Sequence, residues 1–406
     1  MRVVPGQAGS FQLRSLIGGV YLPALLFGIG QWMVIPVIPL FADELGAVVV
    51  IVGLIVAARG AGSMIGDVPA GLITRRLGGR ATMTAGVLLT AATAAAMGFS
   101  SGPAVLGLFV LLNGLAFALW HVSRLAYMTE TVPIEYRGRA LSLVGGLTRV
   151  GFFTGPIIGG FLGEAAGLEA VFFAQAGVVG AAALFVATRL RQPEAAGPDT
   201  PARSHIGLRA VALAERRSLL VAGPVAITLV LIRHGRQFLI PVWGADIGLS
   251  VDEIGLVFGL ASAVDMVLFY PVGMVMDRWG RKWAIVPSLV VLSASLILFP
   301  LTGDFVSFLL VGLLSGFGNG LGSGAVMTLG ADLAPRDATG EFLGLWRFVG
   351  DSGAVAAPVA VGALAGALTL GTAAVATGGV GLLGAAVMLL LVRETLTRSP
   401  ARASPG

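Results

Sequence analysis

The sequence predicts an all-α membrane protein, with twelve transmembrane helices arranged as two pseudo-symmetric six-helix bundles. Three observations carry this prediction: an apolar composition, twelve long apolar stretches and an internal repeat. Of 406 residues, 56% are hydrophobic and only 12% are charged, about half the roughly 25% charged fraction of a soluble domain. Twelve membrane helices of about 20 residues need roughly 240 positions. The composition therefore excludes an ordinary soluble domain.

The apolar stretches are taken in order along the chain. They occupy residues 16–41, 48–72, 81–100, 104–128, 140–163, 169–188, 218–243, 251–274, 283–301, 305–329, 340–366 and 372–392. Each is longer than a membrane strand, and none alternates as a barrel strand does, so helices are expected to satisfy the backbone in lipid. The first is too long for a signal-peptide core and is expected to be an uncleaved span.

Basic residues predict the topology. Of 26 Lys and Arg residues, six lie inside the stretches, and the other 20 fall on the side that holds both termini. The six are Arg59, Arg124, Arg149, Arg233, Arg236 and Arg347. The charged residues of the loops on the opposite side are all acidic and include Asp43 and Asp304. Since basic residues stay in the cytoplasm, we expect a multi-pass protein of the plasma membrane with both termini cytoplasmic.

An internal repeat predicts the domain organisation. A polar stretch, 189–217, contains a Pro- and Gly-rich run at the middle of the chain and is interpreted as a cytoplasmic linker. It separates a bundle at 1–188 from a bundle at 218–406, which ends in a short cytoplasmic tail. A shift of 202 positions superposes Pro39 on Pro241, Gly46 on Gly248, Gly53 on Gly255, Gly71 on Gly273, Pro133 on Pro335, Gly138 on Gly340, Pro156 on Pro358 and Gly160 on Gly362. One constant shift indicates duplication.

Several function classes are excluded by what the sequence lacks. There is no cysteine and there are three histidines, so neither a metal site nor a cofactor is expected. The net charge is +5, but the basic residues are scattered between apolar runs, so no nucleic-acid partner is expected. No phosphate-binding loop is present. We expect a monomeric, non-enzymatic protein whose partners are the lipid bilayer, a small-molecule substrate and protons.

A ten-residue motif identifies a family. The stretch Gly273-Met-Val-Met-Asp277-Arg278-Trp-Gly280-Arg281-Lys282 resembles the G-x-x-x-D-R-x-G-R-K signature of the major facilitator superfamily. The physical expectation is that the first glycine packs a helix end tightly, the acid faces a helix amino terminus and the basic cluster anchors the turn. The first half carries the equivalent residues Gly71, Arg75, Arg76, Gly78 and Arg80, with arginine in place of the acid. The resemblance covers the whole chain and implies a transporter working by alternating access.

A second motif refines the resemblance. In the fifth stretch, Gly151-Phe-Phe-Thr-Gly155-Pro156-Ile-Ile-Gly159-Gly160 is similar to an element of the drug:proton antiporters. Glycines four apart allow close helix packing, and Pro156 is expected to kink the helix. Ser142 and Val110 stand where that group often carries glycine and arginine. The resemblance favours efflux over uptake.

Charged residues inside the stretches predict the coupling mechanism. Each costs about 3 kcal/mol at the bilayer centre and needs a partner, water or a function. The family packs span two against span eleven and span five against span eight, and depth counting then pairs Arg149 with Asp265, Asp67 with Arg347, and Arg59 with Asp351. The pairs either hold the halves together or exchange during transport. In the second case an acid released from its arginine takes up a proton, and Asp265 or Asp351 is the expected carrier.

Polar residues on the spans that line the family's central cavity predict a substrate site. Arg233 and Arg236 in span seven share a face, with His234 between them. Gln31 and Trp32 occupy the equivalent places in span one, and Trp120 in span four adds an aromatic wall. The excess of arginines over acids inside the spans indicates an anionic substrate, unless water or backbone carbonyls solvate them.

The repeat also predicts an inner gate. The first half carries Arg75 and Arg139 where the second half carries Asp277 and Glu341. If each loop docks on the opposite half, Asp277 meets Arg139 and Arg75 meets Glu341. Both contacts would be attractive, each by at most about 1 kcal/mol.

Three functions remain open at this point. The first is proton-driven export of a small amphipathic or drug-like compound. The second is proton-coupled uptake of a small organic anion, and the third is a non-transporting receptor on the same fold.

Overall fold

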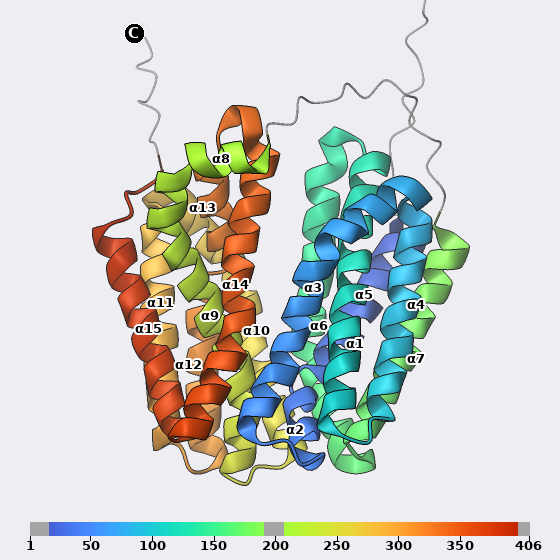
Figure 1. Ribbon diagram of the computed structural model, residues 1–406, viewed down its shortest axis with the longest axis vertical. Helices are drawn as coiled ribbons and strands as arrows, with labels where there is room; N and C mark the ends of the chain where they lie inside the picture. The colour runs from blue at the N-terminus through green and yellow to red at the C-terminus, as the bar shows by residue number, and fades with distance from the viewer. Residues whose placement is uncertain (1–15, 191–206, 397–406) are drawn as a thin grey trace, which may run out of the picture. The chain divides into compact units, whose positions relative to one another are not determined.

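The computed structural model describes residues 16–190 and 207–396 (Figure 1). Within these ranges the chain is helical without strands, and twelve segments are long and apolar enough to cross a membrane. The predicted fold class is therefore confirmed. Most of the predicted linker, 191–206, lies outside the described residues, as do the predicted terminal arms, 1–15 and 397–406.

The chain divides into two compact units. The first comprises Met1–Gly46 and Ala58–Thr200, and the second comprises Ala47–Ala57 and Pro201–Gly406. The first turns of the second span thus group with the second unit, whereas the sequence placed them in the first bundle. A side chain at Gly53 would collide with the backbone of Pro358 and touch Gly362, so close backbone packing holds this segment there.

The first unit contains six spans. In order, its helices are the π-helical turn η2 (Ile17–Tyr21), α1 (Leu22–Val34), α2 (Val37–Glu44), α3 (Val49–Leu77), α4 (Gly79–Gly98), α5 (Pro103–Thr131), α6 (Ile134–Ala166) and α7 (Leu168–Arg189). The sequence predicts a first span over 16–41, and the structure has one span-forming segment at Ile17–Glu44. Its helix is interrupted at Ile35 and Pro36 and resumes as α2. Proline lacks the N–H that would continue the helical ladder.

The second unit repeats this order. It contains α8 (Leu208–Ala214), α9 (Arg216–Asp246), α10 (Val251–Trp279), α11 (Lys282–Leu298), η3 (Phe299–Leu301), α12 (Phe305–Leu321), α13 (Ala325–Leu333), η4 (Arg336–Ala338), α14 (Thr339–Ala367) and α15 (Leu370–Leu390). The predicted tenth span, 305–329, is divided into α12 and α13 by the turn Gly322–Gly324. Gly324 has φ +78°, a conformation that glycine adopts without steric cost.

Close glycine contacts show the duplication inside each unit. In the first, a side chain at Gly114 on α5 would collide with the backbone oxygen of Arg59 on α3. In the second, a side chain at Gly316 on α12 would collide with the backbone oxygen of Ala261 on α10. Both members of the second contact lie 202 positions after those of the first. The repeat read from the sequence therefore extends to helix packing.

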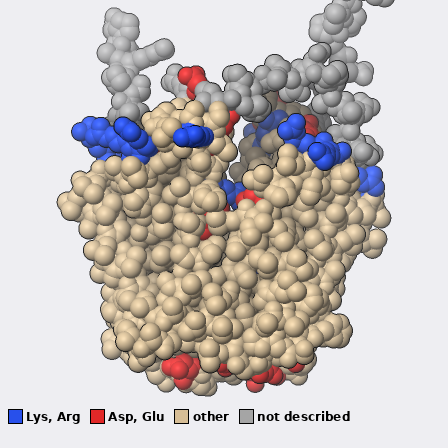
Figure 2. Space-filling model, viewed as in Figure 1, with Lys and Arg blue, Asp and Glu red and all other residues tan. Residues whose placement is uncertain are grey.

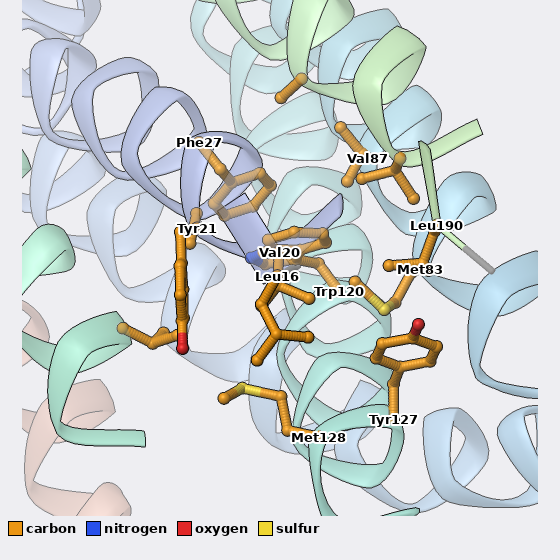
Figure 3. Close-up of a cluster of buried hydrophobic side chains, with 14 of the residues drawn as sticks. Leu16, Val20, Tyr21, Phe27, Met83, Val87, Trp120, Tyr127, Met128 and Leu190 are labelled. Atoms are coloured by element: carbon orange, nitrogen blue, oxygen red, sulfur yellow. The ribbon is translucent and has the colours of Figure 1, made fainter. Parts of the chain in front are cut away.

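The core of the first unit is aromatic and lies between η2, α1, α4, α5 and α7 (Figure 3). Phe27 on α1 stacks on Trp120 on α5 with ring centroids 4.9 Å apart. Tyr127, Met128 and Leu190 belong to the same core, in which Met128 lies below Leu16 in the view of Figure 3. This packing fixes α1 against α5, and it therefore positions the polar residues that α1 carries on its next turn.

Candidate functional site

A cluster of polar side chains lies among the helices of the first unit. Gln31 on α1 accepts a hydrogen bond from the Arg59 guanidinium on α3 at 2.8 Å, and from the side-chain amide of Gln175 on α7 at 3.4 Å. Gln31 is 2% exposed and Gln175 is fully buried. The Arg59 guanidinium carbon lies 5.6 Å from the centre of the Phe117 ring on α5. Four helices thus converge on one cationic centre.

A second polar cluster occupies the second unit around the break between α12 and α13. Arg236 on α9 donates to the Ser315 hydroxyl at 3.3 Å, and Arg233 donates to the backbone oxygen of Asn319 at 3.3 Å. The Asp265 carboxylate on α10 accepts from Ser323 at 3.3 Å and attracts Arg236 electrostatically. The two arginines therefore face α12, as their spacing of three predicts. Arg233 binds near the carboxyl end of α12, where backbone oxygens lack helical partners.

The other predicted cavity residues lie in different surroundings from one another. Trp32 packs on Phe152 of α6, with ring centroids 4.0 Å apart, and His234 contacts the backbone oxygen of Val230 through Nδ1 at 3.0 Å. Trp120 is 1% exposed within the core. It is a packing residue there, which corrects the expectation of an aromatic cavity wall. The large apolar ring is stabilised by burial against Phe27.

The charged residues of α14 pair with one another. Arg347 and Asp351 are one turn apart, with Nε and Oδ2 separated by 3.3 Å, and each side chain is nearly two-fifths exposed. Asp67 lies on α3 and Arg149 on α6, both in the first unit. The three predicted pairs, Arg149 with Asp265, Asp67 with Arg347 and Arg59 with Asp351, each join one unit to the other and stay predictions.

The signature motif of the second half forms a charged network between α10 and α11. The guanidinium of Arg281 binds Asp332 at 2.8 Å, Asp277 at 3.2 Å and the backbone oxygen of Met276 at 2.7 Å. The bond to Asp332 raises the pKa of Arg281, and this effect with that of Asp277 exceeds the opposing effect of burial. Asp277 and Asp332 thus hold Arg281 in one position.

The acid at the amino terminus of α11 is Glu394, not Asp277. The Glu394 carboxylate accepts from the backbone N–H groups of Arg281 and Lys282, at 2.8 and 3.0 Å. Partial burial opposes ionisation, but these two bonds and two more, from Thr395 and Leu396, lower the pKa of Glu394 below its ordinary value. The sequence expectation for Asp277 is therefore corrected, because Asp277 binds Arg281 on the following turn.

The glycines of the motif have different roles. Gly280 has φ +114°, and a side chain there would lie 2.5 Å from the Glu394 carboxylate. Gly78 in the first half also has a positive φ, +82°. In contrast, no heavy atom of another described segment lies within 4 Å of the side-chain position of Gly71 or Gly273. The expectation that these two glycines pack a helix end tightly stays a prediction.

The remaining gate residues lie at the ends of helices. Arg75 and Arg76 are exposed in the last turn of α3, and Arg80 donates to the backbone oxygen of Ala187 at 2.6 Å. Arg278 closes α10 and Lys282 opens α11, where its ammonium donates to Leu389. Arg139 lies near the start of α6 and Glu341 in the first turn of α14. Their docking on Asp277 and Arg75 would again join the units and stays a prediction.

The glycine motif of α6 faces α1. Side chains at Gly151, Gly155 and Gly159 would collide with the backbone of α1 at Gly28, Ile29 and Met33. Pro156 and Gly160 are buried on the same helix. The spacing of four therefore places a smooth face against α1 and allows the two backbones to touch.

Charge is polarised along each unit. Lys and Arg gather at the end that carries α8 in the second unit and the α3–α4 turn in the first (Figure 2). Carboxylates gather at the opposite ends, where α2 ends at Glu44 and α9 ends at Asp246 (Figure 2). Among the described residues, no group of three His, Asp or Glu side chains could hold a metal ion.

Sequence reasoning missed several residues of these clusters. Gln175, Ser323, Asp332 and Glu394 all make bonds to predicted residues. Gln175 is the one amide side chain of α7. A single amide in an otherwise apolar span is a signal that could have identified it from the sequence. Glu394 gives no such signal, because its partner is a helix terminus far away in the chain.

Twelve apolar helices in two repeated units, with charges buried inside them, define a multi-pass membrane transporter. The family model of the Major Facilitator Superfamily matches residues 20–234 and 225–405. The chain belongs to this superfamily, and it resembles the drug:proton antiporters.

Among curated proteins, the chain is similar to multidrug resistance protein MdtH. It is 26% identical over 351 residues to that of Klebsiella pneumoniae (strain 342), covering 83% of both chains. It is 28% identical over 358 residues to that of Cronobacter sakazakii (strain ATCC BAA-894), again covering 83% of both. These relatives are transporters and not enzymes.

Solved structures share the fold. A bacterial homolog to the human lysosomal transporter Spinster, in an inward-facing and unoccupied conformation, superposes with a TM-score of 0.79 at 15% identity, covering 94% of this chain and 98% of that one. A D-xylose-proton symporter superposes with a TM-score of 0.71 at 16% identity, with the same coverage.

Proposed function

We propose that this transporter exports a small amphipathic compound from the cytoplasm in exchange for protons, by alternating access. The observation that carries the proposal is the second-unit cluster, in which the buried Asp265 carboxylate lies near Arg236 and binds Ser323. Ionisable groups inside a membrane are costly and are kept where they transport ions or substrates. The names of the MdtH relatives and the glycine motif of α6 support export as the direction.

Asp265 is the proposed proton carrier. The residue is 6% exposed, and its carboxylate attracts Arg236. Movement of α10 or α9 would separate Asp265 from Arg236 during the transport cycle. This separation involves one unit only, because Asp265 and Arg236 both belong to the second unit. Asp351 is the second candidate carrier, since it pairs with Arg347 in a half-exposed position.

Transport in everted membrane vesicles tests the proposal. Vesicles acidified inside by respiration should accumulate ethidium when they contain the wild-type protein, and a protonophore should abolish the accumulation. Asp265→Asn should abolish gradient-driven accumulation while retaining ethidium exchange without a gradient. The matched control is Asp43→Asn, an exposed carboxylate at the end of α2, which should transport as the wild type does. Loss of ethidium from energised vesicles would contradict export.

We also propose that both termini lie in the cytoplasm, at the plasma membrane. The polarised charge of each unit supports this, because basic residues stay on the cytoplasmic side. The absence of cysteine from the chain allows a clean check with single-cysteine variants. An impermeant maleimide should label Ser101→Cys on intact cells and Arg76→Cys only in everted vesicles. The reverse pattern would overturn the orientation.

Uptake of an organic anion is the second candidate. It is favoured by Arg233 and Arg236, which present two cationic groups on one face of α9. The vesicle experiment separates the two directions, because a proton-coupled importer would lower the internal concentration of its substrate in everted vesicles.

A further inference from the structure

The polar cluster of the first unit has hydrogen-bonding capacity that no described residue uses. The Nε of Arg59, the Nε2 of Gln31 and the Oε1 of Gln175 are buried and have no hydrogen-bond partner among the described residues. Buried polar atoms are normally paired, and each unpaired one in a native structure needs an explanation. Two unused donors and one unused acceptor therefore lie within a single connected cluster.

The orientation of both glutamine amides is fixed by Arg59. A guanidinium can only donate, so the Gln31 atom that it contacts at 2.8 Å must be the oxygen. The Gln175 atom that approaches the same oxygen at 3.4 Å must then be its nitrogen. The unused atoms are consequently the Gln31 amide nitrogen, a donor, and the Gln175 oxygen, an acceptor. A simple exchange of oxygen and nitrogen would not satisfy the cluster.

The cluster also carries a charge that no described carboxylate of its own unit pairs with. The described partners of Arg59 are the Gln31 oxygen and the face of Phe117. Asp67, the acid of α3, lies eight residues further along the helix, about 12 Å by the rise of an α-helix. Neutral oxygens and a ring face stabilise a buried cation less well than an anion does. An anionic group is therefore the complementary ligand, and it would bind Arg59 in place of Asp351, the partner predicted from the sequence.

We propose that Arg59, Gln31 and Gln175 form a binding site for a carboxylate-bearing compound. The two unused donors meet the carboxylate oxygens, and the Gln175 oxygen accepts from a hydroxyl or N–H group beside the carboxylate. The Phe117 ring lies next to this point, between the Arg59 guanidinium and the His121 ring, which stacks on it with centroids 5.7 Å apart, so aromatic side chains border the site. The site rests on the proposed function only in taking this ligand as one of the transported compounds.

Three related probes test the site on the purified full-length chain in detergent, with binding measured by calorimetry. Salicylate carries a carboxylate and a neighbouring hydroxyl, benzoate lacks the hydroxyl, and salicylamide lacks the charge. The wild-type protein should bind salicylate most tightly. Arg59→Gln should weaken salicylate binding by about tenfold or more, the loss expected for a hydrogen bond to a charged group. The affinity for salicylamide should change far less. Gln175→Leu should remove the preference for salicylate over benzoate.

Matched variants separate a binding role from a structural one. Arg124 on α5 lies over Trp120, 5.4 Å from the ring centroid, so Arg124→Gln removes a comparable arginine of the same unit and should leave salicylate binding unchanged. Arg59→Lys keeps the positive charge but loses the several N–H donors of the guanidinium, and it should bind salicylate with intermediate affinity. This variant tests the site even if Arg59→Gln does not fold.

Two results would overturn the site. One is that the wild-type protein does not bind salicylate, and the other is that Arg59→Gln loses equal affinity for salicylate and for salicylamide. These measurements need no ion gradient. A chain that exports ethidium without binding salicylate would therefore disprove this site alone, and one that binds salicylate without exporting would support the site and contradict the proposed function.

Discussion

The carboxylate of Glu394 accepts hydrogen bonds from the backbone N–H groups at the start of α11 and from those of its own segment. It lies at the positive end of α11, where an anion is stabilised by the helix dipole. Gly280 leaves the room that this approach needs. The motif glycine and a distant acid thus form one structural unit.

Glu394→Gln should therefore destabilise the protein in a pH-dependent way. The pKa of Glu394 is lowered by folding, so its stabilisation is complete above the ordinary glutamate value of 4.5 and is lost as the pH falls through the lower folded value. In detergent, the melting temperature of Glu394→Gln should lie below that of the wild type at pH 7. The gap should narrow below pH 4.5. A gap that stays constant down to pH 3 would show that the charge contributes nothing.

Residue-level prediction from the sequence succeeded where the partner is close in the chain. The spacing of Arg233 and Arg236 predicts their shared face, and both contact α12. It failed for Asp277, because the choice between Asp277 and Glu394 depends on how the end of α15 returns to α11. No local pattern contains that information.

At the scale of elements, glycine contacts determine how closely the helices approach. The contact of Gly114 with α3 and that of Gly316 with α10 are equivalent under the repeat. A methyl group at either position would meet a backbone oxygen, which cannot rotate away as a flexible side chain can.

Gly114→Ala and Gly316→Ala should each destabilise the protein by about 1–3 kcal/mol, the usual cost of overpacking. Gly379→Ala on α15 is the control, since within the described part of the chain no heavy atom of another segment lies within 4 Å of its side-chain position. Thermal unfolding in detergent measures all three. If the three variants melt together, backbone contact at these glycines does not limit stability.

The existence of the helices followed from the sequence, but two interruptions did not. The turn at Gly322–Gly324 and the break before α2 both fall within continuous apolar runs. Apolarity predicts a span without saying whether its backbone is continuous, and glycine and proline are common in membrane helices in either case. The hydroxyl of Ser288, which binds the oxygen of Gly318 at 2.6 Å, is a tertiary partner that helps to stabilise the end of α12.

At the scale of the whole molecule, duplication and the distribution of charge connect the sequence to transport. The repeat of 202 positions reappears in the helix contacts of each unit. Basic residues gather at one end of each unit and acidic residues at the other, and the proposed topology depends on this distribution. Depth counting along the chain could not establish which charges pair, because ion pairs depend on side-chain direction as well as depth. In the structure Arg347 binds Asp351 on its own helix.

Reconstitution of the purified protein into proteoliposomes tests the central claim of proton-driven export most directly. A pH gradient is imposed with the interior acidic, a trapped fluorescent dye reports the internal pH, and ethidium is added outside. The account predicts that ethidium dissipates the gradient through the wild-type protein and through Asp43→Asn, and that Asp265→Asn leaves the gradient intact. Equal dissipation by wild type and Asp265→Asn, or none by the wild type, would contradict it.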